Sequence, residues 1–325
     1  MGRGSYYAER NTIMTILWCG GEDIDFAAMG NTYTSTAQCS TAFARAGYGN
    51  GTYAITPELA PFTSIWAHFY VADPRTGLHS KIMFRESIAS NKAIAIRGSY
   101  ADLLITSYNG TTHTTLVTAT DVLTYDPTAF DVQLISYGAA GTVNVYANGV
   151  LIATYTGDLT VCGAASLSCF YFGSASNDEF FSEIIIADED TRLMRLKTLA
   201  PNADGDTNDW TGAYTDVDEL EGSDIDKIYT DTDGDDFQCN LTGMPAGSYQ
   251  VKAVKITARA VDAAGVLGVQ LGVKSGGTVN VGSTQEVEGY WTLIERLMSV
   301  NPVTGVAWTP TDIESLQINL RAKTV

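Results

Sequence analysis

The chain has 325 residues and 45% of them are hydrophobic, so it is long enough for two domains and apolar enough to bury real cores. Its net charge is -18 with only 19 basic residues, and such a surface repels nucleic-acid phosphates and anionic membranes. Nucleic acid and membranes are therefore excluded as expected partners.

The N-terminal stretch contains one short apolar run, from Ile13 to Cys19, with polar and charged residues on both sides. This run is too short for a secretory signal, and no segment reaches the length of a membrane span. We therefore expect synthesis in the cytoplasm. The five cysteines are odd in number and irregularly spaced, which favours buried free thiols. A bridge between Cys162 and Cys169 stays open as the alternative.

From residue 63 onward, short runs rich in aromatic and β-branched residues follow one another at even spacing, which predicts strands. The pair Asn148-Gly149 lies between two of these runs and favours positive φ at both turn positions, so a type I′ hairpin is expected there. No helical period is visible, and the pattern predicts a β-sandwich. The expected strands are 63–71, 80–84, 92–98, 101–108, 130–137, 142–149, 150–155, 168–173 and 180–189.

The same stretch resembles a known family. An aromatic strand and a paired meander are followed by "VNVYANGVLIATYTG" and "FYFGSASNDEFFSEIIIADE". This order is similar to the concanavalin A-like, laminin-G-type jelly roll, over about residues 10 to 195. The resemblance implies a jelly-roll sandwich.

The composition changes after residue 195. Residues 201–240 contain thirteen Asp or Glu and a single base, Lys227. Beyond them, three runs alternate between apolar and polar residues, which is typical of a half-solvated antiparallel sheet. These runs are 248–261, 266–277 and 316–324.

We therefore expect an all-β chain with a jelly-roll sandwich and a smaller C-terminal antiparallel β-sandwich. The predicted parts are an N-terminal segment with the first strands (1–60), the jelly roll (61–195), an acidic turn-rich connection (196–240) and the C-terminal sandwich (241–325).

The second half carries the more specific resemblance. The "SGGT" hairpin at 275–278 and the "NP-x-TG-x-AWT" loop at 301–309 are similar to a C-terminal β-domain of structural proteins from tailed bacteriophages. In those proteins this domain typically follows a laminin-G-like domain. The resemblance covers about residues 196 to 325 and implies a virion protein.

The stretch "YTDTDGDDF" at 229–237 raises the question of a calcium site. Neither Asp231 nor Asp204 starts an EF-hand loop, because position six is not Gly and position twelve is not Glu. A looser Ca²⁺ site built from Asp231, Asp233 and Asp235 is one reading. A solvated acidic turn that enters the second sandwich is the other.

Catalytic patterns are weak. Glu22 and Asp25 lack the third carboxylate that jelly-roll glucanases usually supply, and Glu183 and Asp188 have the odd spacing that places side chains on opposite strand faces. No GxSxG motif occurs, and His68, His79 and His113 have no metal-ligand spacing. We therefore expect no enzymatic activity.

Sugar binding is the remaining chemical hypothesis. Exposed aromatic side chains can stack on sugar rings while amides and carboxylates bind hydroxyl groups. Residues of these types are expected at strand ends or loops, although tyrosine is also a common strand residue. The candidates are Tyr100, Tyr108, Asn109, Tyr125, Tyr137 and Asn177.

The sequence thus favours a non-enzymatic bacteriophage structural protein, tail- or fibre-associated, that adheres to host-surface glycans. Residues 1–60 would dock it to other virion proteins, and the virion would be its location after assembly in the host cytoplasm. The resemblance implies a homo-oligomer, and trimers are common among such proteins. A head fibre or capsid decoration protein is the first alternative, and a non-viral carbohydrate-binding module or degenerate glycanase is the second.

Overall fold

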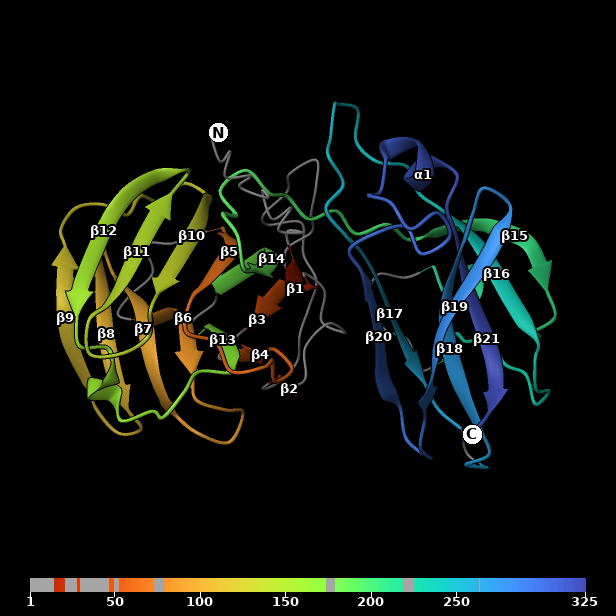
Figure 1. Cartoon of the computed structure of the whole chain (residues 1–325), viewed down its shortest axis with the longest axis horizontal. Coiled ribbons are helices and arrows are strands. Elements are labelled where there is room, and N and C mark those ends of the chain that lie inside the picture. The colour runs from red at the N-terminus through yellow and green to blue at the C-terminus, as the bar shows by residue number, and fades with distance from the viewer. Residues whose placement is uncertain are drawn as a thin grey trace, which may run out of the picture.

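The chain folds into two β-sandwiches joined in sequence (Figure 1). The computed structural model describes residues 15–20, 28–29, 47–49, 53–72, 79–173, 179–218, 225–262 and 264–325. Within these ranges the one α-helix is α1 (Pro310–Glu314), and no helix is long and apolar enough to cross a membrane. The expected all-β class with antiparallel sheets is confirmed.

One sheet of the N-terminal sandwich has the strand order β1-β14-β5-β10-β11-β12, and β3 also pairs with β14, on the side opposite to β5. Neighbouring strands are antiparallel throughout. The strands are β1 (Ile16–Gly20), β3 (Gly47–Gly49), β5 (Ile65–Val71), β10 (Thr128–Ile135), β11 (Gly141–Ala147), β12 (Val150–Gly157) and β14 (Glu179–Ala187).

The opposite sheet has the order β2-β4-β13-β6-β7-β8-β9, again antiparallel. Its strands are β2 (Ala28–Met29), β4 (Tyr53–Ile55), β6 (His79–Arg85), β7 (Lys92–Ser99), β8 (Asp102–Asn109), β9 (His113–Ala119) and β13 (Cys169–Gly173). Strands β1 to β4 fall within residues 1–60, so the sandwich begins well before residue 61.

Aromatic side chains fill the space between the two sheets. Phe69 of β5 is fully buried and packs against Phe130 of β10 at 5.5 Å and Phe172 of β13 at 5.6 Å between ring centroids. Since side chains alternate along a strand, the residues between these inward-facing ones form the outer face of each sheet. That alternation decides which side chains remain available to a ligand.

The hairpin between β11 and β12 has the predicted turn. Asn148 and Gly149 have φ values of +48° and +79°, which a type I′ turn requires. The pairing of β11 with β12 is not regular, because a bulge between Val145 and Tyr146 shifts the register by one residue. This shift sets which side chains of β12 lie beside those of β11.

The C-terminal sandwich combines a sheet of order β15-β16-β21-β18-β19 with the pair β17-β20. The alternating runs of the sequence become β17, β18 and β21, and their apolar faces form one buried cluster with Trp308 and Ile313. The strands are β15 (Pro201–Asn208), β16 (Asp236–Leu241), β17 (Val254–Ala260), β18 (Leu267–Ser275), β19 (Thr278–Glu286), β20 (Thr292–Met298) and β21 (Gln317–Thr324).

Residues 196–240 are more than a connection, which corrects the expectation for this segment, because they contribute β15 and β16 to the larger sheet. Acidic side chains are tolerated there because basic and amide groups face them. Asp206 bonds Lys274 and Gln317, while Asp236 receives two hydrogen bonds from Arg321 at 2.9 and 2.6 Å. An edge strand such as β15 also gains from charges that discourage aggregation.

The two sequence signatures of the second half have structural roles. Gly276 and Gly277 form the β18–β19 turn with φ values of +55° and +81°. In the 301–309 loop, the buried Asn301 donates to Ser275 Oγ at 2.9 Å, and the Trp308 indole donates to the Met298 carbonyl at 2.9 Å. The loop therefore fastens β20 to the β18–β19 turn.

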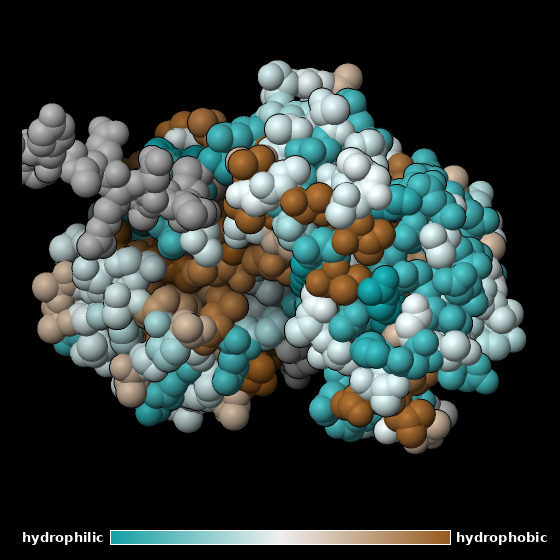
Figure 2. All heavy atoms as spheres, turned by 45° about the vertical axis from the view of Figure 1, so that its right-hand side comes forward, coloured by the Kyte–Doolittle hydropathy of each residue, from teal (hydrophilic) through white to brown (hydrophobic). Residues whose placement is uncertain are grey.

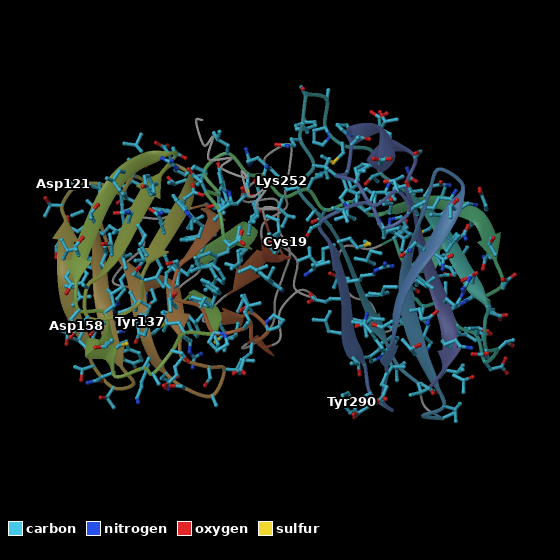
Figure 3. The ribbon with its side chains drawn as sticks, in the orientation of Figure 1. Cys19, Asp121, Tyr137, Asp158, Lys252 and Tyr290 are labelled. Atoms are coloured by element: carbon cyan, nitrogen blue, oxygen red, sulfur yellow. The ribbon has the colours of Figure 1, made fainter. Side chains whose placement is uncertain are left out.

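The two sandwiches meet through an apolar contact. Ile16, Cys19 and Ile185 of the first sandwich form a cluster that Ala253 and Leu297 of the second sandwich join. Figure 2 shows hydrophobic surface in the hollow between the two lobes, and Figure 3 places Cys19 and Lys252 at this junction. The cysteines of the described residues are buried and free, so no bridge joins Cys162 to Cys169.

Candidate functional site

The outer face of the sheet around β5 carries an organised set of polar and aromatic side chains. Residues Ile65, Ala67 and Phe69 of β5 point into the core, so Trp66 and His68 lie on the outer face. In the same way, the core positions of β10, β11 and β12 leave the intervening residues facing outward. The register then decides which of these outward residues are neighbours.

Three polar side chains form a ladder across the sheet. Gln133 lies opposite both Trp66 and Asn144, and Asn144 lies opposite Thr154. The Asn144 amide donates to Gln133 Oε1 at 3.0 Å, and the Thr154 hydroxyl donates to Asn144 Oδ1 at 3.0 Å. The Gln133 amide nitrogen and the second Asn144 N–H retain donor capacity, so the ladder can still bind hydroxyl groups.

An aromatic stack borders this ladder. The Trp66 and Tyr146 rings are stacked at 5.7 Å with an interplanar angle of 25°. The Arg192 guanidinium lies over both, with Cζ 4.7 Å from the Tyr146 centroid and 5.6 Å from that of Trp66. Guanidinium groups favour aromatic faces, so the three side chains form a platform. Trp66 is buried in it, and its exposed part is formed by Tyr146 and Arg192.

Asp190 fixes the guanidinium from the side. Arg192 Nε and Nη2 donate to the two oxygens of Asp190 at 2.9 and 2.5 Å, and the Arg192 amide donates to Oδ1 at 3.0 Å. These hydrogen bonds hold the pKa of Asp190 below its usual range, and the carboxylate in turn raises the pKa of Arg192. A partly exposed carboxylate therefore accompanies the platform at neutral pH.

Two buried contacts hold the segment that carries Asp190 and Arg192. Thr191 and His68 both bond Asp131 Oδ1 at 2.8 Å, and all three side chains are buried. Arg195 donates to both oxygens of the fully buried Glu183 at 2.5 Å. Residues 190–195 are thus pinned to the outer face of the sheet at both ends.

The sequence-predicted sugar residues do not form one group. Tyr100, with φ +54°, and Tyr125 are strongly exposed, and a hydrogen bond from Leu123 to the Ala101 carbonyl places their two loops side by side. Tyr108 and Asn109 lie at the far end of β8. Asn177 lies outside the described residues.

Two of the remaining candidates have structural partners. The Asn109 carboxamide oxygen accepts hydrogen bonds from the amides of Thr111 and Thr112 at 3.0 and 2.9 Å and so orders the β8–β9 turn. Tyr137, labelled in Figure 3, donates to the Ala164 carbonyl at 2.8 Å, and burial raises its pKa. Both side chains serve the fold.

Tyr108 belongs to a second, smaller aromatic surface. Its ring stacks on His113 of β9 at 4.3 Å with an angle of 18°, and Thr106 lies 3.0 Å from His113 Nδ1. Burial, followed by the positive charge of Arg97, lowers the pKa of His113 to about 4, so the ring is neutral at pH 7.

The acidic turn does not assemble a metal site. Asp233 accepts from Lys323 Nζ at 2.8 Å and from the Thr324 amide at 2.6 Å, and these bonds lower its pKa to about 2. Asp235 accepts from Thr230, and Asp231 from Thr232. No three His, Cys, Asp or Glu side chains gather as a metal would need anywhere in the described ranges.

Of the carboxylate pairs considered for hydrolysis, the described pair, Glu183 and Asp188, is not assembled either. Glu183 is occupied by Arg195, and Asp188 accepts from the Thr15 amide at 3.0 Å. Glu22 and Asp25 lie outside the described residues. The His68–Asp131 pair resembles half of a catalytic triad, but His68 Nε2 is buried without a hydrogen-bond partner.

No protein-family model matches the chain, and no curated protein matches it. Domain 4 of an extracellular arabinanase from Geobacillus stearothermophilus, solved with arabinotriose, is 19% identical, with 52% of this chain and 80% of that one covered and a TM-score of 0.36.

Two further structures are similar to the same extent. A carbohydrate esterase from the Shiga toxin-encoding bacteriophage phi24B is 11% identical, with 54% of this chain and 98% of that one covered and a TM-score of 0.35. A tetrameric galectin from the sponge Cinachyrella is 16% identical, with 41% and 96% covered and a TM-score of 0.30. At these scores the likenesses establish neither a family nor a function.

Proposed function

We propose that the chain is a non-enzymatic structural protein of a tailed bacteriophage, associated with the tail or a fibre, that adheres to a host-surface glycan. The observation that carries the glycan-binding role is the platform of Trp66, Tyr146 and Arg192 beside the ladder of Gln133, Asn144 and Thr154. The virion role is supported by the sequence resemblance of the second half alone.

The face has the chemistry that a sugar ring needs. A sugar presents an apolar face of C–H groups and a rim of hydroxyls, so it fits an aromatic or guanidinium plane flanked by amides and a carboxylate. Trp66, Gln133, Asn144 and Thr154 occupy four neighbouring strands, which span about 14 Å at the usual inter-strand spacing. That width gives room for an oligosaccharide.

The proposal includes no turnover. Asp190 is bound by Arg192, and a second carboxylate of this face, Asp131, is buried and bonded to His68 and Thr191. A retaining or inverting glycosidase needs two carboxyl groups on either side of the scissile bond. Binding without cleavage is the activity that this arrangement supports.

A glycan microarray probed with the full chain tests the glycan-binding role. Tyr146→Ala should weaken binding to any positive glycan by about tenfold, which corresponds to about 1.4 kcal/mol for a lost ring contact. Tyr125→Ala, an exposed tyrosine of the same sandwich that lies in a loop, is the matched control and should bind like the parent chain.

The opposite result for these two variants would place the glycan-binding site elsewhere on the sandwich. Loss of binding in Tyr125→Ala with full binding in Tyr146→Ala would contradict the proposed face and support the residues at the β7–β8 end. Release of reducing sugar from a bound glycan would contradict the non-enzymatic part of the proposal.

Immunogold electron microscopy of purified virions tests the structural role. We expect gold at the tail end. Gold around the capsid would instead make the chain a head fibre or decoration protein, and unlabelled particles would favour a non-viral carbohydrate-binding module.

A further inference from the structure

The two sheets of the N-terminal sandwich differ in charge. No Lys or Arg occurs in the described strands of the sheet that carries the platform of Trp66, Tyr146 and Arg192. Lys and Arg are the side chains that usually bind carboxylates, sulfates and phosphates. The strands below the platform therefore lack the groups that an acidic sugar needs. The described strands of the opposite sheet, by contrast, contain Lys81, Arg85, Lys92 and Arg97.

The basic side chains that do reach this face come from the segment 188–195, and both are already paired. Arg195 donates to both oxygens of the buried Glu183. Arg192 donates from Nε and Nη2 to Asp190 at 2.9 and 2.5 Å. The Asp190 side chain is 45% exposed and the Arg192 side chain 37%, so a ligand at the platform meets the two opposite charges together.

A further carboxylate lies beside this pair. Asp131 is buried, bonds Thr191 of the same segment, and lies opposite Tyr146 in the sheet. The hydrogen bonds to Asp190 raise the pKa of Arg192, and the charge of Asp131 adds to the rise. With histidine counted as neutral, two carboxylates surround one guanidinium. The local charge therefore has the same sign as the net charge of -18.

The other hydrogen-bonding groups of the face are uncharged. They are the amides of Gln133 and Asn144 and the hydroxyl of Thr154. A sugar hydroxyl both accepts and donates, so it can accept from an amide N–H and donate to an oxygen of Asp190. A ligand carboxylate only accepts, so it would gain from the amides while Asp190 repels it.

We propose that this face selects glycans without carboxylate, sulfate or phosphate groups and excludes acidic sugars such as uronates and sialates. The inference rests on the proposed function, because it names the class of glycan bound at the same platform. A ligand carboxylate attracted to Arg192 would have to approach Asp190, whose two oxygens already face that guanidinium. Repulsion between the two carboxylates offsets the attraction.

A glycan microarray that carries matched neutral and acidic oligosaccharides tests the selectivity with the full chain. The matched pairs are galactotetraose with tetragalacturonate, mannotetraose with tetramannuronate, and lactose with sialyllactose. In any pair that binds, the neutral member should bind at least about tenfold more tightly, and every other positive glycan should lack acidic groups. Raising the NaCl concentration from about 50 to about 500 mM should narrow the difference within a pair, because salt screens the repulsion.

Two variants locate the cause of the selectivity. Asp190→Asn and Asp121→Asn each remove one negative charge, but only Asp190 bonds Arg192. Asp121 is exposed and follows β9 of the opposite sheet (Figure 3), and asparagine tolerates its φ of +55°. Asp190→Asn should reduce the ratio of neutral to acidic binding by at least about fivefold. Asp121→Asn is the matched control and should keep the ratio of the parent chain.

The possible failures are distinguishable. An acidic glycan bound as tightly as its neutral counterpart would overturn the selectivity and leave the glycan-binding role intact. Equal effects of Asp190→Asn and Asp121→Asn would also overturn it, because the preference would then come from the net charge of the chain. An array without any positive glycan would contradict the proposed function itself, and the selectivity with it.

Discussion

The ion pair between Arg195 and Glu183 should be a main attachment of the segment that carries Arg192. Glu183 is fully buried, has a φ of +54°, and has both oxygens bound by Arg195, whose side chain is 37% exposed. Arg195→Met would remove both of these hydrogen bonds from a fully buried carboxylate. Such a loss costs about 3–5 kcal/mol, and the partial exposure of Arg195 places the expected cost near the lower end, at about 3 kcal/mol.

Urea unfolding of the parent chain, Arg195→Met, Glu183→Gln and the double variant measures this cost. In a domain of this size, about 3 kcal/mol corresponds to a fall of about 6–12 °C in melting temperature. The double variant should be more stable than the sum of the single effects predicts, because it removes the buried charge together with its partner.

The control is Lys323→Met, which breaks the exposed pair between Lys323 and Asp233 and should have no measurable effect. If Arg195→Met lowered the free energy of unfolding as little as Lys323→Met does, the argument that the buried Glu183 needs Arg195 as its partner would be wrong. Additive effects of the two single variants would refute the direct coupling between Arg195 and Glu183.

Two further predictions concern protons and metals. His113 has a folded-state pKa of about 4 against 6.5 when unfolded, so the unfolded chain binds a proton that the folded chain does not; stability should therefore fall as the pH drops from about 6.5 to 4. We expect His113→Gln to reduce the loss of unfolding free energy between pH 7.5 and pH 4.5 by about 1–2 kcal/mol, after allowance for the partial exposure of the ring. Urea unfolding at the two pH values measures this loss. An equal loss in the variant and the parent chain would contradict the prediction. Excess EDTA and excess Ca²⁺ should give the same melting temperature, because Asp233 is already bound by Lys323 and Thr324. A clear rise with Ca²⁺, absent in Asp233→Asn, would support the calcium hypothesis instead.

Local signals in the sequence predicted much of the fold. The Asn148-Gly149 turn and the alternating runs that become β17, β18 and β21 depend only on neighbouring residues, and the structure has them, although β17 begins at Val254 and not at residue 248. Strand β9 was missed because its residues are mostly polar and none of them is buried. The acidic strands β15 and β16 were missed because their carboxylates are stabilised by partners far along the chain, such as Lys274 and Arg321.

The candidate site could not be predicted in the same way. Asn144 and Thr154 become neighbours only because a bulge shifts the register of their hairpin by one residue. Arg192 reaches Trp66 and Tyr146 only because Thr191 and Arg195 fix its segment against distant strands. The alternation of residues along each strand does predict that Gln133, Asn144 and Thr154 face outward. It does not show that these three side chains lie next to one another.

A titration of the full chain with a glycan that it binds, followed through the side-chain amide NMR signals, tests the central claim most directly. The account predicts that the signals of Gln133 and Asn144 shift, while those of Gln238 and Asn319, a buried pair in the second sandwich bonded at 2.8 Å, do not. If the Gln133 and Asn144 signals stayed fixed while the ring signals of His113 shifted, the binding face would lie on the opposite sheet and the account would be wrong.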